Sequence, residues 1–196
     1  MGDLWLARHG ETEWSRSGRH TGRSDLPLTA QGEAEARRLG ALLRGRTFGL
    51  VLTSPLRRAR DTCALAGYGA VAEVDPGLSE WDYGAYEGWH LDEIRREQPG
   101  WTIWTGVVRG GESAAQVAAR VGSVLERAAA APGDALLFGH GHALRMLALA
   151  WVGLPPADGR ALALDTATVS VLGADAHGER VIQLWNGPGL PGPAAG

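Results

Sequence analysis

Two short apolar segments that run straight into polar residues limit the folds open to this chain. Leu4 to Arg8 (LWLAR) and Ala135 to Phe138 (ALLF) are apolar enough for buried strands, and a turn containing histidine and glycine follows each. After the second turn, Leu144, Leu147 and Trp151 share one face of a helical pattern. The repeated order of strand, polar turn and helix predicts an α/β fold.

The segments between and after these strands continue the alternation. Residues 49–53 (GLVLT) read as a buried strand, and residues 29–46 as a helix that Thr29 caps. Ser54 and Pro55 are predicted to begin the next helix, as the cap and the first helical residue. The remaining assignments are strands at 71–74, 168–172 and 181–185 and helices at 91–98 and 113–130. Right-handed crossovers then predict a three-layer α/β/α sandwich with a mostly parallel sheet.

Length and composition predict one domain. The chain has 196 residues, of which 44% are hydrophobic and 21% charged, as in ordinary globular proteins. We expect a single domain over residues 1–185 and a Pro/Gly-rich tail without regular structure over 186–196. Within the domain, the aromatic and glycine-rich residues 80–110 are expected to form a lid or insertion. Its tryptophans fit either internal packing or closure over a substrate.

Charge and cysteine content exclude several classes of protein. The net charge of −3 provides no general attraction for nucleic acid or an anionic membrane. Cys63 is the only cysteine, so no intrachain disulfide can form, and we expect it to be buried packing. Neither a signal peptide nor a membrane-spanning segment is visible, which favours a cytoplasmic protein. The sequence is also compatible with a homodimer.

Several cationic residues are expected to meet at one edge of the sheet. In open parallel sheets ligands bind beyond the carboxyl ends of the strands, where Arg8, His9, Arg58 and His140 are all placed. Guanidinium groups and the N–H groups of one or two helix N-termini match the oxygens of a phosphoryl group. The sequence therefore predicts a phosphoryl-binding site at this edge.

The same residues suggest a reaction. Nearby guanidinium groups disfavour a protonated imidazole, so His9 is expected to stay neutral and nucleophilic. Glu80, in LSEWDYG, is the candidate proton donor for the leaving oxygen and can then activate water. His140 and His142 are spaced as two zinc ligands, but no further cysteine or histidine lies close in sequence, so a metal site is disfavoured.

Four segments together resemble the motifs of the histidine phosphatase superfamily, over nearly the whole chain. The segments are RHGET, TSPLRRARDT, LSEWDYGAYEG and FGHGHALR. The resemblance implies a phosphoglycerate mutase-like fold, phosphorylation of His9 in turnover and no metal or cofactor. It also implies that Arg8, Arg58 and His140 bind the transferring phosphoryl group and that Glu80 protonates the leaving group.

Further positions bear on the substrate. Ser15 stands where phosphoglycerate mutases usually have asparagine, and GHGHALR is similar to fungal sedoheptulose bisphosphatases and small bacterial acid phosphatases. Arg145 in that segment is a candidate for binding a second anionic group. The other histidines, His20, His90 and His177, are expected to be exposed or structural. The candidate substrate contacts are Ser15, Thr21, Gly22, Tyr83, His142 and Arg145.

Three functions remain open at this point. The favoured one is a phosphomonoester hydrolase, of acid phosphatase or sugar phosphatase type, acting on a small phosphorylated metabolite. A cofactor-dependent phosphoglycerate mutase is the alternative on the same scaffold. A phospholigand-binding protein without turnover is the third.

Overall fold

A six-stranded sheet forms the centre of the molecule, in the order β3-β2-β4-β1-β5-β6. The computed structural model describes residues 2–187. The strands are β1 (Leu4–Arg8), β2 (Leu50–Thr53), β3 (Glu73–Val74), β4 (Ala135–Gly139), β5 (Val169–Ala174) and β6 (Arg180–Gly187). The α-helices are α1 (Glu13–Ser17), α2 (Ala30–Leu43), α3 (Arg57–Leu65), α4 (Leu91–Glu97), α5 (Ala114–Ala129) and α6 (Gly141–Val152). Short 3-10 helices are η1 (Pro76–Leu78), η2 (Gly84–Tyr86) and η3 (Pro156–Ala161).

The sheet is mixed, and its parallel part is the one predicted. Strands β1 to β4 pair in parallel, whereas β5 and β6 join antiparallel. The turn between β5 and β6 is too short for a crossover helix, so these two strands can only form a hairpin. The helical crossovers between the first four strands bring the carboxyl ends of β1, β2 and β4 to one edge.

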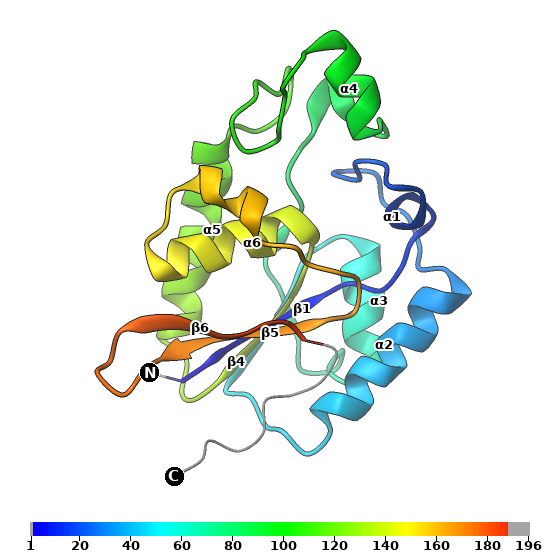
Figure 1. Cartoon of the computed structure of the whole chain (residues 1–196). Helices are drawn as coiled ribbons and strands as arrows, with labels where there is room; N and C mark the ends of the chain where they lie inside the picture. Colours follow the sequence, from blue (N-terminus) through cyan, green and yellow to red (C-terminus); the bar gives the residue numbers. More distant parts are fainter. Residues whose placement is uncertain (1, 188–196) are drawn as a thin grey trace.

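Helices cover both faces of the sheet, as Figure 1 shows: α5 and α6 lie on one face and α2 and α3 on the other. Successive residues of β1 point to opposite faces. Leu4 and Leu6 belong to the larger hydrophobic cluster, whereas Trp5 and Ala7 belong to the cluster that contains Cys63. Cys63 is thus packing, as predicted, and burial raises the pKa of its thiol to about 12.

Several predicted boundaries were wrong. The helix predicted at 29–46 ends at Leu43, and the strand predicted at 71–74 begins at Glu73. Helix α3 begins at Arg57 and not at Ser54, because Leu56 still has an extended backbone and no side chain caps the helix. The Ser54 hydroxyl instead accepts from the backbone N–H of Leu56 at 3.2 Å and contacts His140. At the other end, Asn186 and Gly187 belong to β6, so regular structure extends past residue 185. The rest of the predicted tail lies outside the described residues.

Residues 80–110 cover the edge at which the parallel strands end, with α4 at the top of Figure 1. The side chains of Trp81, Tyr86 and Ile94 are almost fully buried and belong to the larger hydrophobic cluster. This segment is therefore continuous with the main core. Among the described helices, none combines the length and the apolar character needed to cross a bilayer.

Candidate active site

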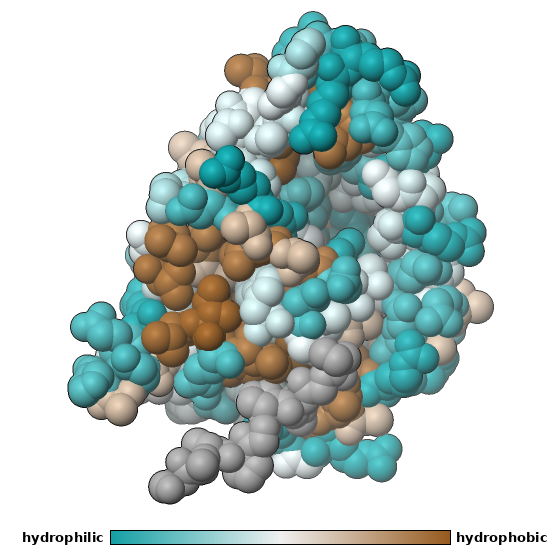
Figure 2. All heavy atoms as spheres, in the orientation of Figure 1, coloured by the Kyte–Doolittle hydropathy of each residue, from teal (hydrophilic) through white to brown (hydrophobic). Residues whose placement is uncertain are grey.

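A cavity of about 330 Å³ lies beyond the carboxyl ends of β1 and β4. Figure 2 shows the surface hollowed here, between α4 and α1. Its walls come from segments far apart in sequence: the end of β1, the region around α1, the 80–110 segment, the start of α6 and the stretch before β5. Its lining residues are Arg8, His9, Ser15, Gly18, Arg19, His20, Thr21, Glu80, Tyr83, Leu91, Gly141, His142, Arg145 and Leu164.

His9 lines the cavity and is only 4% exposed. The Gly10 carbonyl lies 2.7 Å from its Nδ1 atom and can only accept a hydrogen bond, so Nδ1 carries the proton. The neutral ring then has a lone pair at Nε2, as a nucleophile requires. Burial, followed by the charges of Arg58 and Arg8, holds the pKa of His9 well below its usual value. These contacts agree with the expected neutral imidazole.

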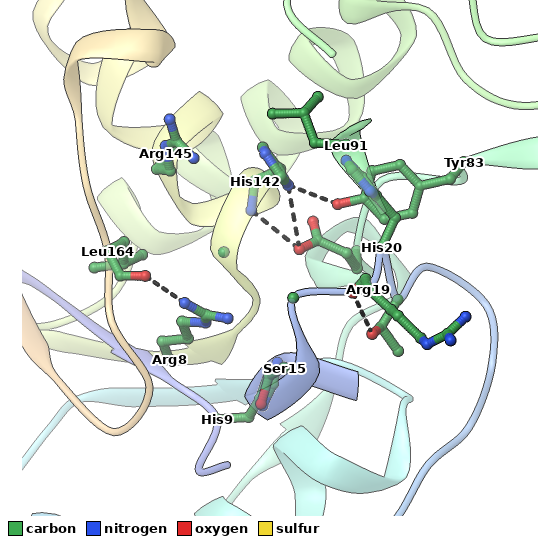
Figure 3. A pocket seen from close by; sticks show the side chains of 14 residues that line it. Arg8, His9, Ser15, Arg19, His20, Tyr83, Leu91, His142, Arg145 and Leu164 are labelled. Carbon is green, nitrogen blue, oxygen red and sulfur yellow. Dashed lines mark hydrogen bonds and ion pairs between the residues drawn. The ribbon is translucent and has the colours of Figure 1, made fainter. Parts of the chain in front are cut away.

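Arg8 places a guanidinium group in the same cavity (Figure 3). Its Nη1 atom donates to the carbonyl of Leu164, which orients the group. Its Nε atom is buried and is the one such side-chain nitrogen or oxygen without a hydrogen-bond partner in residues 2–187. A buried donor without a partner is costly, so this atom is suited to an acceptor on a bound ligand.

Arg58 and His140 form a buried pair behind His9. Both are fully buried, and Arg58 Nε donates to His140 Nδ1 at 3.1 Å. The His140 ring therefore carries its proton on Nε2, which lies 2.7 Å from the Ser54 hydroxyl. Its centroid is 5.1 Å from that of the His9 ring. Burial, followed by the charge of Arg58, holds the pKa of His140 well below its usual value.

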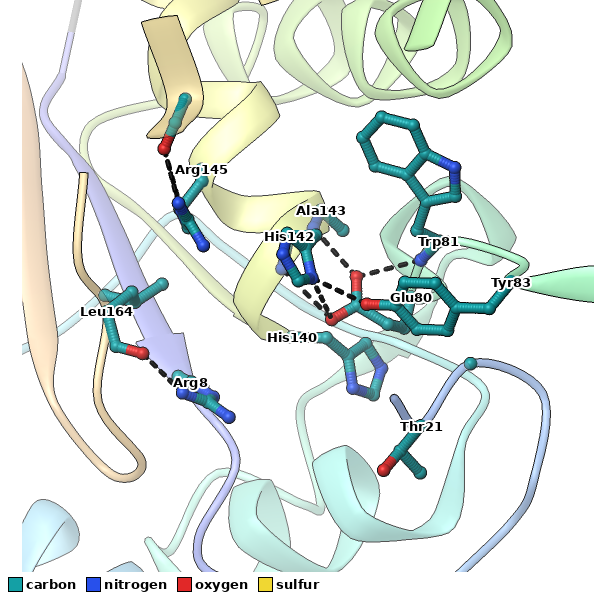
Figure 4. A network of polar contacts seen from close by, with 12 residues as sticks. Arg8, Thr21, Glu80, Trp81, Tyr83, His140, His142, Ala143, Arg145 and Leu164 are labelled. Carbon is teal, nitrogen blue, oxygen red and sulfur yellow. Dashed lines mark hydrogen bonds and ion pairs between the residues drawn. The ribbon is translucent and has the colours of Figure 1, made fainter. Parts of the chain in front are cut away.

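The Glu80 carboxylate is bound at the N-terminus of α6 (Figure 4). One of its oxygens accepts from the backbone N–H groups of Trp81 at 2.8 Å and Ala143 at 2.9 Å. The other accepts from the N–H of His142 at 3.0 Å. Glu80 lines the cavity with 7% of its surface exposed, so the helix fixes a carboxylate where it can meet a ligand.

The expected role of the helix N-termini was therefore wrong. The first N–H groups of α6 bind Glu80, and the N–H of Arg57 at the start of α3 donates to Asp25 at 2.6 Å. Carboxylates of the chain itself thus occupy both predicted anion sites. The cationic character of the cavity comes from its side chains instead.

Tyr83 and His142 form a second hydrogen-bonded pair on the cavity wall, with 2.6 Å between the phenol oxygen and His142 Nδ1. Burial and the Glu80 charge raise the pKa of Tyr83 well above its usual value. Burial, followed by Arg145 and His20, holds the pKa of His142 well below its usual value. The protonated phenol therefore donates to His142 Nδ1, which leaves the His142 N–H on Nε2.

Three other predicted substrate contacts, Ser15, Thr21 and Gly22, differ in whether they line the cavity. Ser15 lines the cavity, and its hydroxyl also accepts from the Thr12 N–H at 2.8 Å within the α1 capping box. Thr21 lines the cavity as well, whereas Gly22 does not. Both position Arg58, because their carbonyl oxygens each accept from its Nη2 atom at 3.0 Å.

Sequence reasoning missed three lining residues in the segment WSRSGRHTGR, namely Gly18, Arg19 and His20. Arg19 and His20 both line the cavity, although His20 was expected to be exposed or structural. His20 is held by a 2.9 Å contact between its Nδ1 atom and the Trp89 carbonyl, and burial lowers its pKa. The proximity of Arg19 and His20 to Ser15 and Thr21 in sequence was the available signal. Within the described part of the chain, no group of three or more His, Cys, Asp or Glu side chains is arranged to hold a metal.

Comparison with known proteins identifies the family. Residues 4–187 match the model of the Histidine phosphatase superfamily (branch 1), and the chain belongs to this family. The match spans every strand of the sheet and all of the cavity residues.

Three proteins similar to this chain are phosphatases. An acid phosphatase of Mycobacterium tuberculosis is 41% identical over 98% of this chain and 96% of its own length. A sedoheptulose 1,7-bisphosphatase of Saccharomyces cerevisiae is 36% identical over 76% of this chain and 67% of its own. The structure of a mycobacterial glucosyl-3-phosphoglycerate phosphatase superposes with a TM-score of 0.84 at 30% identity, covering 95% of this chain and 99% of that one.

Proposed function

We propose that this chain is a phosphomonoester hydrolase of acid phosphatase or sugar phosphatase type, acting on small phosphorylated metabolites through a phosphohistidine on His9. The observation that carries the proposal is the arrangement at the end of β1. A neutral imidazole with its lone pair on Nε2 lines the same cavity as Arg8, whose Nε atom is buried without a partner in residues 2–187. A nucleophile beside an unsatisfied cationic donor suits an incoming phosphoryl group.

The reaction proceeds in two displacements. His9 Nε2 attacks phosphorus, the bond from phosphorus to the ester oxygen breaks, and Glu80 in its protonated form gives that oxygen a proton. Glu80 then takes a proton from water, whose oxygen attacks phosphorus and breaks the bond to Nε2, releasing inorganic phosphate. Arg8 and Arg58 stabilise the charge on the transferring group, and no metal takes part.

His140 completes the phosphoryl-binding site in this proposal. Its Nε2 atom carries the proton and lies 2.7 Å from the Ser54 hydroxyl. A bound phosphoryl oxygen must therefore either displace this hydroxyl and accept from Nε2, or interact with His140 only indirectly, through Arg58. The two hydrolytic relatives, an acid phosphatase and a sedoheptulose bisphosphatase, support hydrolysis of sugar phosphates by this chain.

The wider setting is part of the same proposal. A single domain that reaches the end of β6 at Gly187, with residues 80–110 covering the site, works in a reducing cytoplasm and requires neither nucleic acid nor a membrane. The single buried cysteine and the net charge of −3 support this setting. A homodimer is compatible with it.

The proposal is tested by phosphate release from a panel of phosphate esters. His9→Ala is expected to lower kcat by at least about 10³-fold, because the nucleophile is lost. His177→Ala, at an exposed histidine in the β5–β6 turn, is the matched control and should retain full activity. Glu80→Gln should lower kcat by about 10²- to 10⁴-fold, because an amide cannot transfer the proton. Equal rates for His9→Ala and the parent enzyme would falsify the proposal.

The phosphoglycerate mutase remains the second candidate, because it would use the same pocket. Interconversion of 2- and 3-phosphoglycerate that depends on a bisphosphate primer, and that outpaces phosphate release, would favour it. Tight binding of phosphate esters with no release of phosphate would instead favour a non-catalytic binding protein. Following both products in one assay separates all three functions.

A further inference from the structure

Arg120 of α5 donates hydrogen bonds to the segment that carries Glu80, although it does not line the candidate active site. Its Nη1 atom donates to the carbonyl oxygens of Gly77 at 2.8 Å and Ser79 at 2.6 Å. Its Nη2 atom donates to the carbonyl oxygen of Glu80 at 3.2 Å. One guanidinium group therefore holds three backbone carbonyls, the last of them that of Glu80 itself.

Glu112, just before α5, is the partner of Arg120. Its two carboxylate oxygens accept from Arg120 Nε at 2.8 Å and from Nη2 at 3.0 Å. One of these oxygens also accepts from the backbone N–H of Asp82 at 2.9 Å, and the Glu112 carbonyl accepts from the Trp81 indole N–H at 2.8 Å. Together the pair binds the chain on both sides of Glu80: Arg120 holds the residues before it, and Glu112 holds the two residues after it.

The pair is saturated and shielded from water. All five N–H groups of the Arg120 guanidinium have an acceptor in these contacts. Only 19% of the Arg120 side chain and 21% of the Glu112 side chain are exposed, so water screens the two charges weakly. Burial by itself would raise the pKa of Glu112, but the hydrogen bonds from Arg120 and from the Asp82 N–H hold it below its usual value. Glu112 therefore stays ionised at neutral pH.

The turn before Glu112 is shaped to meet the same segment. An added Cβ on Gly111 would lie 2.2 Å from the Asp82 carbonyl oxygen, so the two stretches of backbone can approach this closely only with glycine there. The N–H of Glu112 donates to that carbonyl at 2.9 Å. Backbone contacts thus fix Glu112 in the place from which its side chain reaches Arg120.

Glu80 depends on this support because residues 79–83 belong to no helix or strand. Its carboxylate reaches across to the start of α6, as Figure 4 shows. The bonds of a regular element therefore do not fix the backbone from which the side chain extends, and the contacts of Arg120 and Glu112 take their place. Displacing a reacting group by about 1 Å can lower a rate by about 10²-fold, so the position of this backbone affects the chemistry.

We infer that Arg120 and Glu112 are positioning residues for proton transfer by Glu80: they hold its backbone so that the protonated carboxyl group meets the leaving oxygen. The inference rests on the proposed function and adds to it two residues that do not line the cavity. Their effect should be greatest where the leaving oxygen needs a proton.

Two aryl phosphates separate this role from a general structural one. p-Nitrophenolate leaves readily without a proton, whereas phenolate, which is as basic as an ordinary tyrosine side chain, needs one. In Arg120→Gln, kcat/KM should fall at least about tenfold more on phenyl phosphate than on p-nitrophenyl phosphate. We compare kcat/KM because it reports on the steps up to phosphorylation of His9.

A second variant and a matched control accompany this measurement. Glu112→Gln keeps the side-chain volume and removes the charge, and it should shift the selectivity in the same direction by at least about threefold. Arg127→Gln is the control and should keep the parent ratio, because Arg127 also lies on α5 but pairs with Glu73 and Asp75. Equal losses on the two esters, or no loss, in either folded variant of the pair would overturn the inference.

A double variant shows whether the effect passes through Glu80. In a Glu80→Gln background the proton donor is already absent, so adding Arg120→Gln should cause no further preferential loss on phenyl phosphate. A preferential loss as large as that in the parent background would mean that Arg120 acts by another route, which refutes the assignment.

Failure of the inference and failure of the proposed function are distinguishable. Selective loss on phenyl phosphate in Glu80→Gln but not in Arg120→Gln removes only the positioning role. Absence of that selectivity in Glu80→Gln, or absence of phosphate release by the parent enzyme, removes the proposed function itself.

Discussion

The charge state of His9 depends on a few individual neighbours. The Gly10 carbonyl selects the tautomer, and burial with two guanidinium groups keeps the ring neutral. Hydrogen bonds hold one of these groups, Arg58, to the carbonyls of Ser24, Thr21 and Gly22. The arginine that lowers the His9 pKa is therefore itself positioned by the segment before α2.

Replacing Arg58 should consequently change the titration of His9. Arg58→Gln is expected to raise the pKa of His9 towards the ordinary histidine value of about 6.5, because a nearby like charge is removed. The measurement is an NMR titration of the His9 imidazole, assigned by the loss of its signals in His9→Ala. Arg57→Gln is the control, since Arg57 is exposed and pairs with Asp61. A parent protein in which His9 titrates near 6.5 would contradict this electrostatic account.

Among the elements, the contact between the loop after β1 and the first turn of α2 determines where the signature histidine lies. An added Cβ on Gly32 would lie 2.1 Å from the carbonyl oxygen of Glu11, and one on Gly10 would lie 2.3 Å from the carbonyl oxygen of Gly32. Helix and loop can approach this closely only because both positions are glycine.

Two glycine-to-alanine changes in helices should accordingly have opposite effects. Gly32→Ala is expected to destabilise the fold by about 1–3 kcal/mol, because backbone must shift to admit the methyl group. Gly122→Ala in α5, where an added Cβ meets nothing within 4 Å, should stabilise by about 0.5–1 kcal/mol. Urea unfolding followed by circular dichroism measures both. Equal stability of the Gly32→Ala variant and the parent would show that the loop has room to move.

Sequence patterns predicted helices and strands well where the pattern depends only on residues close together in the chain. Apolar periodicity identified β1, β4 and α5 to within a residue or two, since side chains at helical or strand spacing face the core together. The start of α3 was misplaced because serine followed by proline also suits a turn. Ser54 is used there by His140, a residue 86 positions away.

Three histidines of the candidate active site, His9, His140 and His142, couple the stability of the whole molecule to pH. Burial is the first cause that lowers the pKa of each in the folded state. The unfolded chain has ordinary values near 6.5 and so binds protons first as the pH falls. Unfolding therefore takes up protons, and stability must decrease as the pH drops below about 6.5.

We expect the free energy of unfolding to fall by more than about 2 kcal/mol between pH 7 and pH 5. Urea titrations at pH 7, 6 and 5 measure the slope. His142→Gln should reduce the slope, whereas His177→Gln, at an exposed site, should leave it unchanged. A stability that is constant between pH 7 and pH 5 would mean that these rings are not buried in the neutral form.

The sequence by itself determined the alternation of strands and helices, the edge at which Arg8, His9 and His140 lie, and the family motifs, because each depends on spacing between near neighbours. Only the tertiary structure decided what those groups contact. Glu80 binds the N–H of His142, 62 residues away, and Asp25 binds the N–H of Arg57, 32 residues away. The cavity lined by Arg95, Arg145 and Arg160 likewise needs three separate elements to pack together. Such contacts follow from how the layers pack, which no local pattern encodes.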